Sequence, residues 1–299
     1  MIKFFLSPYL LKKRQSANSL LQLPIQRGVL VKVADGKCWG VADLCPKPEL
    51  GDAEFEIEIK DRGPLYRRAF ELASEDLNAR RDNLSLLADK PVRNNFLVTD
   101  YRTTALFRKK LSGQTIKIKG DRDVIGLSQI LNGLESEAKL RIDFNSTLTA
   151  EEFDKFISSL SEATRKKIEY IEDPTPICPQ WRNWNTIIPL AFDFQPGEYT
   201  SELADFQIIK PSRQALPERH GQVTLTSAMD HPVGVAHGLR IAQKYATGDS
   251  GFLTMDLYET PFEKYFVQQE CTLNFSEAAR LDTGIGMSAE LEKLIWTGL

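Results

Sequence analysis

Histidine and cysteine are scarce in this chain of 299 residues, which has three histidines and four cysteines. The cysteines are scattered without a C-x-x-C pair, so the sequence indicates neither a disulfide framework nor a structural zinc site. No apolar run is long enough to cross a bilayer. No block of like charge interrupts a chain with 38 Lys and Arg against 41 Asp and Glu. We therefore expect a cytoplasmic protein that binds neither nucleic acid nor a membrane.

The first ninety residues carry a mixture of strand and helix signals. A hairpin is predicted at Asp35-Gly36, because this dipeptide favours a tight turn between two apolar segments. From Pro64 onward, leucine and alanine recur at helical spacing. We expect strands over residues 2–11, 28–34 and 38–43, a strand or a helix start over 54–60, and a helix over 64–87. This pattern predicts an α+β module.

From residue 95 onward, strand and helix signals alternate. The predicted helices include residues 121–133, which begin with acidic side chains, 150–161 and 233–245. Eight short apolar segments are predicted as strands: 95–98, 115–119, 139–143, 167–171, 187–191, 205–210, 222–225 and 251–254. Eight strands that alternate with helices favour a (β/α)8 TIM-type barrel, an α/β fold whose active site lies at the carboxyl ends of its strands.

One polar residue closes each of five consecutive predicted strands. These residues are Lys119, Asp143, Glu172, Asp193 and Lys210. Any one of them alone is more often a solvated loop residue. Five in register with the strand–helix units predict a shared site, because the barrel gathers the strand ends around one mouth. Carboxylates are the ligands that Mg²⁺ prefers, the scarcity of histidine argues against zinc, and the lysines are candidate bases.

Three neighbouring residues are predicted to support this site. Lys117 lies two residues before Lys119 on the same strand, so both project to one face, and each cation favours the neutral form of the other. Arg141 bears the same relation to Asp143 and can orient a carboxylate or screen the metal ligands. Asn145 can hydrogen-bond a ligand. The simpler alternative for Lys117 is an exposed position at the barrel rim.

Other motifs have simpler interpretations. The proline-rich stretch 44–52 is either a lid over the barrel mouth or an ordinary surface connection. For His231 and His237, packing or surface roles are expected rather than catalysis. Gly284 and Gly286 lack the context of a phosphate-binding loop and predict a turn.

Five short motifs together resemble the enolase superfamily. They are K-I-K-G (117–120), L-R-I-D-F-N (140–145), I-E-D-P (171–174), L-A-F-D (190–193) and I-I-K-P-S (208–212). The K-x-K motif and the single lysine after the sixth strand resemble the muconate-lactonizing subgroup. The opening S-P-Y-L-L-K, the segment 226–242 and the closing D-T-G-I-G-M (282–287) are similar to the o-succinylbenzoate synthase family. The resemblance covers nearly the whole chain.

The resemblance implies a modified (β/α)8 barrel with an N-terminal α+β capping domain. The capping domain would span residues 1–92 and be completed by 280–299, and the barrel would span 93–279. Two departures concern the site. Phe194 follows the third acid where many relatives have a second acid, and Asp230 ends a segment that often ends in glutamate.

The resemblance also implies roles for the site residues. The ligands of Mg²⁺, or of Mn²⁺ in its place, would be Asp143, Glu172 and Asp193. Lys119 would act as the general base and then as the acid that assists loss of hydroxide. Lys210 would stabilise the enediolate through a cation–π contact. The substrate pocket would be lined by Thr226, Ser227 and Ala228.

The implied reaction is the syn dehydration of 2-succinyl-6-hydroxy-2,4-cyclohexadiene-1-carboxylate to o-succinylbenzoate in menaquinone biosynthesis. Two alternatives stay open. The same site can racemise N-acylamino acids or epimerise dipeptides, with Lys119 and Lys210 as bases on opposite faces of the substrate. A barrel that has lost catalysis can serve as a binding module. The expected partner is a small-molecule carboxylate, and the expected assembly is a monomer or a small homo-oligomer.

Overall fold

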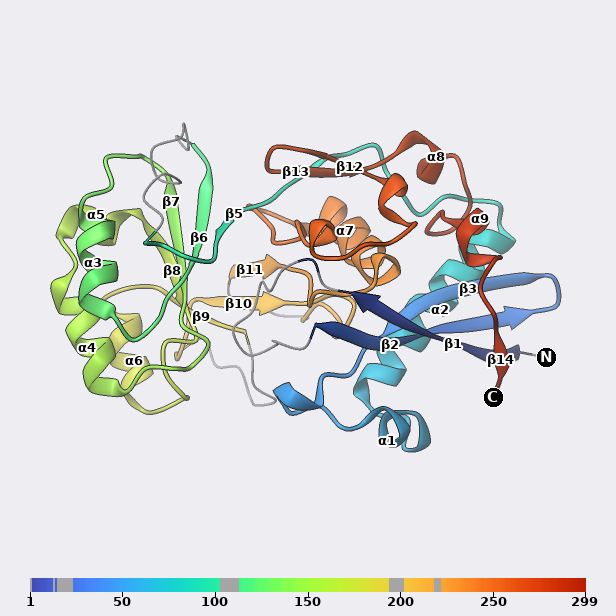
Figure 1. Ribbon diagram of the computed structural model, residues 1–299, viewed down its shortest axis with the longest axis horizontal. Coiled ribbons are helices and arrows are strands. Elements are labelled where there is room, and N and C mark those ends of the chain that lie inside the picture. Colours follow the sequence, from blue (N-terminus) through green and yellow to red (C-terminus); the bar gives the residue numbers. More distant parts are fainter. Residues whose placement is uncertain (1, 13, 15–23, 103–112, 194–201, 218–221) are drawn as a thin grey trace. The chain divides into compact units, whose positions relative to one another are not determined.

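The structure is a computed structural model, and it describes residues 2–12, 14, 24–102, 113–193, 202–217 and 222–299 (Figure 1). The chain divides into two compact units. The first unit contains residues 1–94, 210–216 and 225–299, and the second contains 95–209 and 217–224. The division into a capping domain and a barrel at residues 92 and 280 stays a prediction.

The first unit contains a four-stranded antiparallel sheet with the order β14-β1-β2-β3. Its strands are β1 (Ile2–Lys12), β2 (Ile25–Asp35), β3 (Cys38–Leu44) and β14 (Thr297–Gly298). Asp35 pairs with Cys38 across a tight turn, in which Gly36 takes a positive φ of 64°. The hairpin predicted at Asp35-Gly36 is confirmed.

Two helices follow this sheet, α1 (Phe55–Lys60) and α2 (Pro64–Arg81). Residues 54–60, predicted as a strand or a helix start, therefore begin a helix. Helix α2 packs on β3 at Gly40, where a Cβ atom would lie 2.1 Å from the carbonyl oxygen of Ala73, so a larger residue does not fit there. The helix ends at Arg81 rather than at residue 87, because Asn83 takes a left-handed φ of 54°.

The rest of the first unit contains helices and a small sheet. The helices are α7 (Pro232–Tyr245), α8 (Glu277–Arg280) and α9 (Ser288–Leu291), with short 3₁₀ turns η1 (Pro48–Leu50), η3 (Met255–Leu257) and η4 (Glu263–Tyr265). The sheet has the order β12-β13-β4, with β12 (Phe266–Gln269), β13 (Thr272–Phe275) and β4 (Val92–Arg93).

Buried polar side chains tie these parts together. The carboxylate of Asp76 on α2 accepts hydrogen bonds of 2.8 Å from the backbone N–H groups of Val41 and Ile285. The imidazole of His237 is fully buried and lies 2.8 Å from the carbonyl oxygen of Val41, so the expected packing role is confirmed. The turn predicted at Gly284 and Gly286 is also confirmed, with φ values of 62° and 70°.

A seven-stranded parallel sheet runs in sequential order from β5 to β11. Its strands are β5 (Phe96–Val98), β6 (Thr115–Lys119), β7 (Lys139–Asp143), β8 (Ile168–Glu172), β9 (Leu190–Phe192), β10 (Phe206–Ile209) and β11 (Gln222–Leu225). The strand predicted over 251–254 is wrong: Gly251 makes only a single bridge to Thr226, and the chain turns into η3 directly after Thr254.

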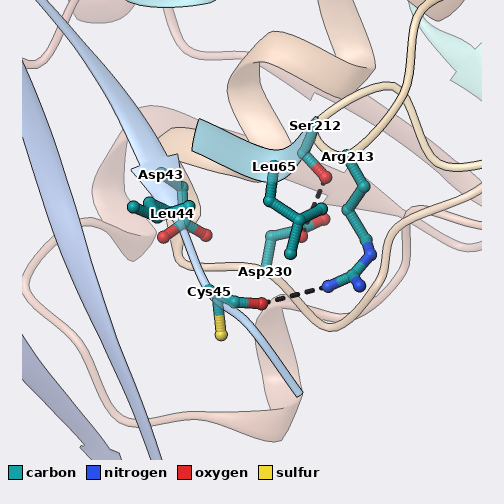
Figure 2. A pocket seen from close by; sticks show the side chains of 7 residues that line it. All are labelled: Asp43, Leu44, Cys45, Leu65, Ser212, Arg213 and Asp230. Carbon is teal, nitrogen blue, oxygen red and sulfur yellow. Dashed lines mark hydrogen bonds between the residues drawn. The ribbon is translucent and has the colours of Figure 1, made fainter. Parts of the chain in front are cut away.

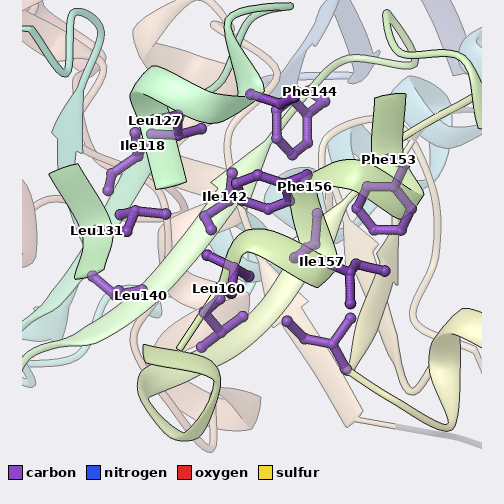
Figure 3. Packing of buried hydrophobic residues seen from close by; sticks show 14 of the residues in the cluster. Ile118, Leu127, Leu131, Leu140, Ile142, Phe144, Phe153, Phe156, Ile157 and Leu160 are labelled. Carbon is purple, nitrogen blue, oxygen red and sulfur yellow. The ribbon is translucent and has the colours of Figure 1, made fainter. Parts of the chain in front are cut away.

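The helices of the second unit are α3 (Val124–Asn132), α4 (Ala150–Ser159), α5 (Glu162–Lys167) and α6 (Gln180–Asn185). Helix α4 starts with a capping box between Thr149 and Glu152. Its Phe153 and Phe156 pack with Phe144 from the end of β7, and Phe144 and Phe156 meet edge to face at 5.2 Å (Figure 3). This apolar layer fixes the strands whose ends carry the polar residues. No helix in the described part of the chain is long and apolar enough to span a bilayer.

Candidate active site

Polar side chains stand at the carboxyl ends of four neighbouring strands in the second unit. Lys119 ends β6, Asp143 ends β7 and Glu172 ends β8, and Asp193 follows β9 directly. The parallel register pairs Lys119 with Asp143, and Asp143 with Glu172. Adjacent strands thus bring together residues that are far apart in the sequence.

The two lysines of the K-x-K motif lie on these carboxylates. The Lys117 amine is 2.7 Å from each carboxylate oxygen of Glu172 and 2.9 Å from Asp143 Oδ2. The Lys119 amine donates a hydrogen bond to the same oxygen of Asp143. Lys117 is therefore part of the buried charge cluster and is not at an exposed rim.

Charge and burial act in opposite directions in this cluster. Burial and the neighbouring Asp143 raise the pKa of Glu172 to about 7. Burial disfavours ionised Asp143, but the charges of Lys117 and Lys119 outweigh burial and lower the pKa of Asp143. Burial also disfavours charged Lys117, but Asp143 and Glu172 raise its pKa well above its ordinary value. Lys117 is therefore a cation at neutral pH.

The donor set fits a hard divalent cation. Asp143 and Glu172 are each 2% exposed, and the negative charge of Asp193 also acts on Glu172. Among the described residues, no three acidic, histidine or cysteine side chains are arranged as a metal site, and the lysine amines lie among the carboxylates instead. Three carboxylates from consecutive strand ends are nevertheless the oxygen ligands that Mg²⁺ and Mn²⁺ prefer.

Arg141 and Asn145 both hydrogen-bond to carboxylates. Arg141 is 1% exposed, and its guanidinium lies 2.6 Å from Glu169 and over the ring of Tyr170, so the carboxylate that it orients is Glu169. Asn145 contributes its backbone N–H to Asp143 Oδ1 at 3.0 Å. Its φ of 49° places it in the left-handed region, where asparagine is tolerated.

Asp173 is a site residue that the sequence analysis missed. It is 5% exposed, and its carboxylate accepts a 3.2 Å hydrogen bond from the backbone N–H of Asp193. Burial and Asp193 raise the pKa of Asp173. The signal available in the sequence was the second acid of the I-E-D-P motif, next to Glu172.

Lys210, the fifth strand-end residue, follows β10, the sheet neighbour of β9, and is counted with the first unit. It opens a tight turn, in which its carbonyl oxygen accepts hydrogen bonds from the N–H groups of Arg213 at 2.8 Å and Gln214 at 3.0 Å. Arg213 in turn donates to the carbonyl oxygen of Cys45 at 3.0 Å (Figure 2). It also pairs with Asp52 at 2.5 Å.

The segment from Thr226 to Ala228 also belongs to the first unit, and Asp230 organises it. The Asp230 carboxylate accepts hydrogen bonds of 3.0 Å from the Ser227 hydroxyl and the Ala228 N–H, and one of 2.9 Å from Ser212. Asp230 and Ser212 line a cavity of about 10 Å³, which is large enough for about one water. Figure 2 shows the side chains around it. The Phe194 departure lies outside the described residues.

The stretch 44–52 contains η1 and is attached at several points to the rest of the first unit. Its Lys47 amine donates to the carbonyl oxygen of Ala228, and Asp52 pairs with Arg213. The stretch also borders a larger cavity of about 710 Å³, which is lined by the ends of β1 and β2 and by residues 45–49 and 54–56. A lid function for residues 44–52 stays a prediction.

Solved structures share this fold over nearly the whole chain. An enolase family member from Agrobacterium tumefaciens with homology to dipeptide epimerases matches with a TM-score of 0.73 and 17% identity, over 93% of this chain and 98% of that one. The o-succinylbenzoate synthase of Thermosynechococcus elongatus, complexed with Mg in its active site, matches with a TM-score of 0.64 and 15% identity, over 86% and 94%. The fold is a modified TIM-type barrel with an N-terminal α+β domain, as in these enolase-type structures.

Sequence comparisons are more specific. Residues 4–79 match the family model described as "O-succinylbenzoate synthase, N-terminal domain". The o-succinylbenzoate synthase of Bdellovibrio bacteriovorus is 32% identical over 99% of this chain and 98% of its own length. The chain belongs to the o-succinylbenzoate synthase family. It is therefore an enzyme of the lyase class. The alternative of a barrel that has lost catalysis and serves as a binding module is not supported.

Proposed function

We propose that this protein is an o-succinylbenzoate synthase, which removes water from 2-succinyl-6-hydroxy-2,4-cyclohexadiene-1-carboxylate. The observation that carries the proposal is the contact between the amine of Lys119 and the carboxylate of Asp143, at the ends of adjacent strands in a chain of this family. An amine in this position can take a proton beside a carboxylate that is bound at the strand ends.

Asp143, Glu172 and Asp193 would hold the metal, which is Mg²⁺ or Mn²⁺. When bound, the divalent ion supplies positive charge next to the substrate carboxylate, where negative charge develops as the α proton leaves. Asp143 and Glu172 support this role because both are buried and both contact the Lys117 amine, so their carboxylates lie close together.

The lysines divide the proton chemistry. Lys119 takes the α proton as general base and then returns a proton to the leaving hydroxide, so the departure is syn. Lys210 stabilises the enediolate of the substrate through a cation–π contact with the substrate ring. Lys117 stays protonated between Asp143 and Glu172 and holds both carboxylates next to the Lys119 amine.

The remaining proposals concern the driving force of the reaction and the substrate pocket. The product ring is aromatic, so the catalyst has mainly to ease removal of the α proton. We propose that Thr226, Ser227 and Ala228 line the pocket, held in place by the bonds of Ser227 and Ala228 to Asp230. A cytoplasmic location and a step in menaquinone synthesis belong to the same proposal.

One assay tests the proposed activity. Purified protein with Mg²⁺ and the cyclohexadiene carboxylate is expected to form o-succinylbenzoate, which is followed by ultraviolet absorbance. The parallel reaction contains N-succinyl amino acids in deuterium oxide. Deuterium at Cα without dehydration of the cyclohexadiene would instead establish the racemase alternative, in which Lys119 and Lys210 both act as bases.

A further inference from the structure

A single carboxylate joins two segments of the first unit that carry residues proposed for the site. Asp230 Oδ1 accepts a 2.9 Å hydrogen bond from the hydroxyl of Ser212, in the turn that Lys210 opens (Figure 2). Asp230 Oδ2 accepts hydrogen bonds of 3.0 Å from Ser227 and Ala228, in the segment proposed to line the substrate pocket. The turn after Lys210 and the pocket segment are therefore linked through Asp230.

A second buried acid, Asp43 on β3, lies beside Asp230. Both side chains line the cavity of about 10 Å³. A Cβ atom at position 234 would lie 2.7 Å from Asp230 Cβ and 2.9 Å from Asp43 Oδ2, so this close approach requires Gly234. The Asp43 oxygens accept hydrogen bonds from the Tyr9 hydroxyl at 2.7 Å and from the His231 N–H at 2.8 Å. Asp43 thus ties the residue after Asp230 to β3.

Titratable groups from the elements packed around this pair of acids act on it. They are Tyr9 on β1, Cys45 after β3, Lys47 in the loop that follows, Arg213 in the turn after β10, His231 at the N-cap of α7 and Tyr258 after η3. Burial raises the pKa of both tyrosines and of the Cys45 thiol, and it lowers the pKa of His231, so these groups are neutral at neutral pH. The cations among the groups are Lys47 and Arg213.

One of these two cations already has a partner. Lys47 acts on both acids of the pair, whereas Arg213 forms an ion pair with Asp52 at 2.5 Å. Asp43 and Asp230 thus share the charge of one lysine in a buried place, where two like charges favour a proton on one of them. Burial and Asp230 raise the pKa of Asp43 to about 7. The shared cavity is large enough for about one water, through which this proton can join the two carboxyl groups.

We propose that Asp43 is a positioning residue of the enzyme: its neutral carboxyl group is joined to Asp230 and so holds the turn after Lys210 and the pocket segment 226–228 in one arrangement. This assignment rests on the proposed function, since Asp43 acts through residues that are assigned to the site there. When Asp43 loses its proton, two like charges meet beside the cavity, and the link between the two segments is weakened. Catalytic efficiency then falls as the pH rises above about 7.

The test measures kcat/KM for the dehydration at about pH 6 and about pH 8 in wild type and in Asp43→Asn, whose amide is neutral at both. The protonated fraction of Asp43 falls about 10-fold over this range, so the ratio of kcat/KM of the variant to that of wild type is expected to rise about 10-fold. Groups that titrate in both proteins cancel in this ratio. Asp61→Asn, at an exposed acid after α1, is the matched control, and its ratio to wild type is expected to stay constant. A constant ratio for Asp43→Asn would overturn the proposal.

Asp43→Leu separates positioning from the loss of charge. Leucine is neutral, but it offers no oxygen to the Tyr9 hydroxyl or the His231 N–H. At about pH 6, kcat/KM of Asp43→Leu is therefore expected to lie on the order of 10-fold or more below that of Asp43→Asn, with circular dichroism to confirm that both variants fold. Equal values for the two folded variants would show that the hydrogen bonds of Asp43 do not position the site. The pH comparison with Asp43→Asn decides the proposal if the leucine variant does not fold.

Thermal unfolding reports the proton on Asp43 without any substrate and so distinguishes this inference from the proposed function. A carboxyl group whose pKa is raised by folding contributes most to stability at low pH, and this contribution is lost as the pH rises to about 7. Between about pH 5 and about pH 7.5, the unfolding temperature of wild type is therefore expected to fall relative to that of Asp43→Asn. Parallel profiles in a protein that performs the dehydration would overturn the role of Asp43 alone. If the protein racemises N-succinyl amino acids instead, the proposed function fails, and the same kcat/KM ratio for racemisation decides whether Asp43 positions the site.

Discussion

Lys117 and Glu172 form a two-point contact, with the Lys117 amine 2.7 Å from both carboxylate oxygens. The residues come from β6 and β8, which are separated in the sheet by β7. The contact holds the Glu172 carboxylate in one orientation beside Asp143, which the same amine also contacts at 2.9 Å. A single cation thus orients two of the three proposed metal ligands.

Glu172→Gln tests the ligand assignment. We expect the affinity for Mg²⁺ to fall on the order of 100-fold, because a neutral amide replaces an anionic oxygen ligand. Titration calorimetry with Mg²⁺ measures the effect. Glu169→Gln is the matched control: Glu169 lies on the same strand but pairs with Arg141, and this variant is expected to keep its affinity for Mg²⁺. Near-normal binding by Glu172→Gln would contradict the assignment.

Lys119→Ala tests the proton chemistry. We expect the rate of dehydration to fall by about 10³ or more, since the general base and the general acid are lost together. Ultraviolet absorbance of o-succinylbenzoate reports the rate, and circular dichroism confirms that the variant folds. Lys139→Ala, at the 68% exposed start of β7, is the control and is expected to keep wild-type activity. Substantial dehydration by the Lys119 variant would remove this residue from the mechanism.

Asp76→Ala tests a structural link in the first unit. The variant leaves the N–H groups of Val41 and Ile285 buried without acceptors and removes the partner of Arg80. We expect the free energy of unfolding to fall by about 3 kcal/mol or more. Urea unfolding gives the value. Glu71→Ala on the same helix removes an exposed pair with Arg68 and is expected to change stability by less than about 0.5 kcal/mol, so similar losses in both variants would contradict this role.

The pH dependence of stability tests the environment of His231. Burial lowers the pKa of His231 to about 3, whereas the unfolded chain takes up a proton near pH 6.5. The contribution of the neutral imidazole is therefore complete above about pH 6.5 and is lost as the pH falls towards 3. His231→Asn removes the titration and keeps an acceptor at the N-cap of α7, where the ring nitrogen accepts from Val233 at 3.1 Å.

Between about pH 7.5 and about pH 5, wild type is expected to lose about 2 kcal/mol of unfolding free energy relative to the His231→Asn variant. Urea unfolding at the two pH values gives the difference. Asp43, whose pKa burial and Asp230 raise to about 7, titrates in both proteins and largely cancels in the comparison. Parallel pH profiles for the two proteins would show that the imidazole takes up its proton in the folded state.

The strands were predictable where local signals agreed. The bounds predicted for β6, β7 and β11 are those observed, because each is a short apolar segment between polar or helical stretches. The candidate eighth strand failed because Gly251 has no side chain to pack and the chain enters η3 soon after it. Helix α2 was predicted too long, because a left-handed residue at Asn83 leaves little trace in the spacing of apolar residues.

The polar residues of the site were found by their positions at strand ends, but their partners were not. Arg141 was predicted to orient a carboxylate or screen the metal ligands, and the carboxylate with which it pairs is Glu169 on the next strand, where the sheet register shifts between Leu140 and Arg141. Asp173 was overlooked because its hydrogen-bond donor, the backbone N–H of Asp193, belongs to another strand–helix unit.

The sequence by itself determined the alternation of strands and helices and the order of acids and lysines along the chain, since both follow from local patterns of apolar and polar residues. Only the tertiary structure decided which charges are buried and which groups neutralise them. Lys47 shows why: it lies in a polar, proline-rich loop, yet its amine is buried on the carbonyl oxygen of Ala228, and burial of a charge depends on residues that the fold brings from far along the chain.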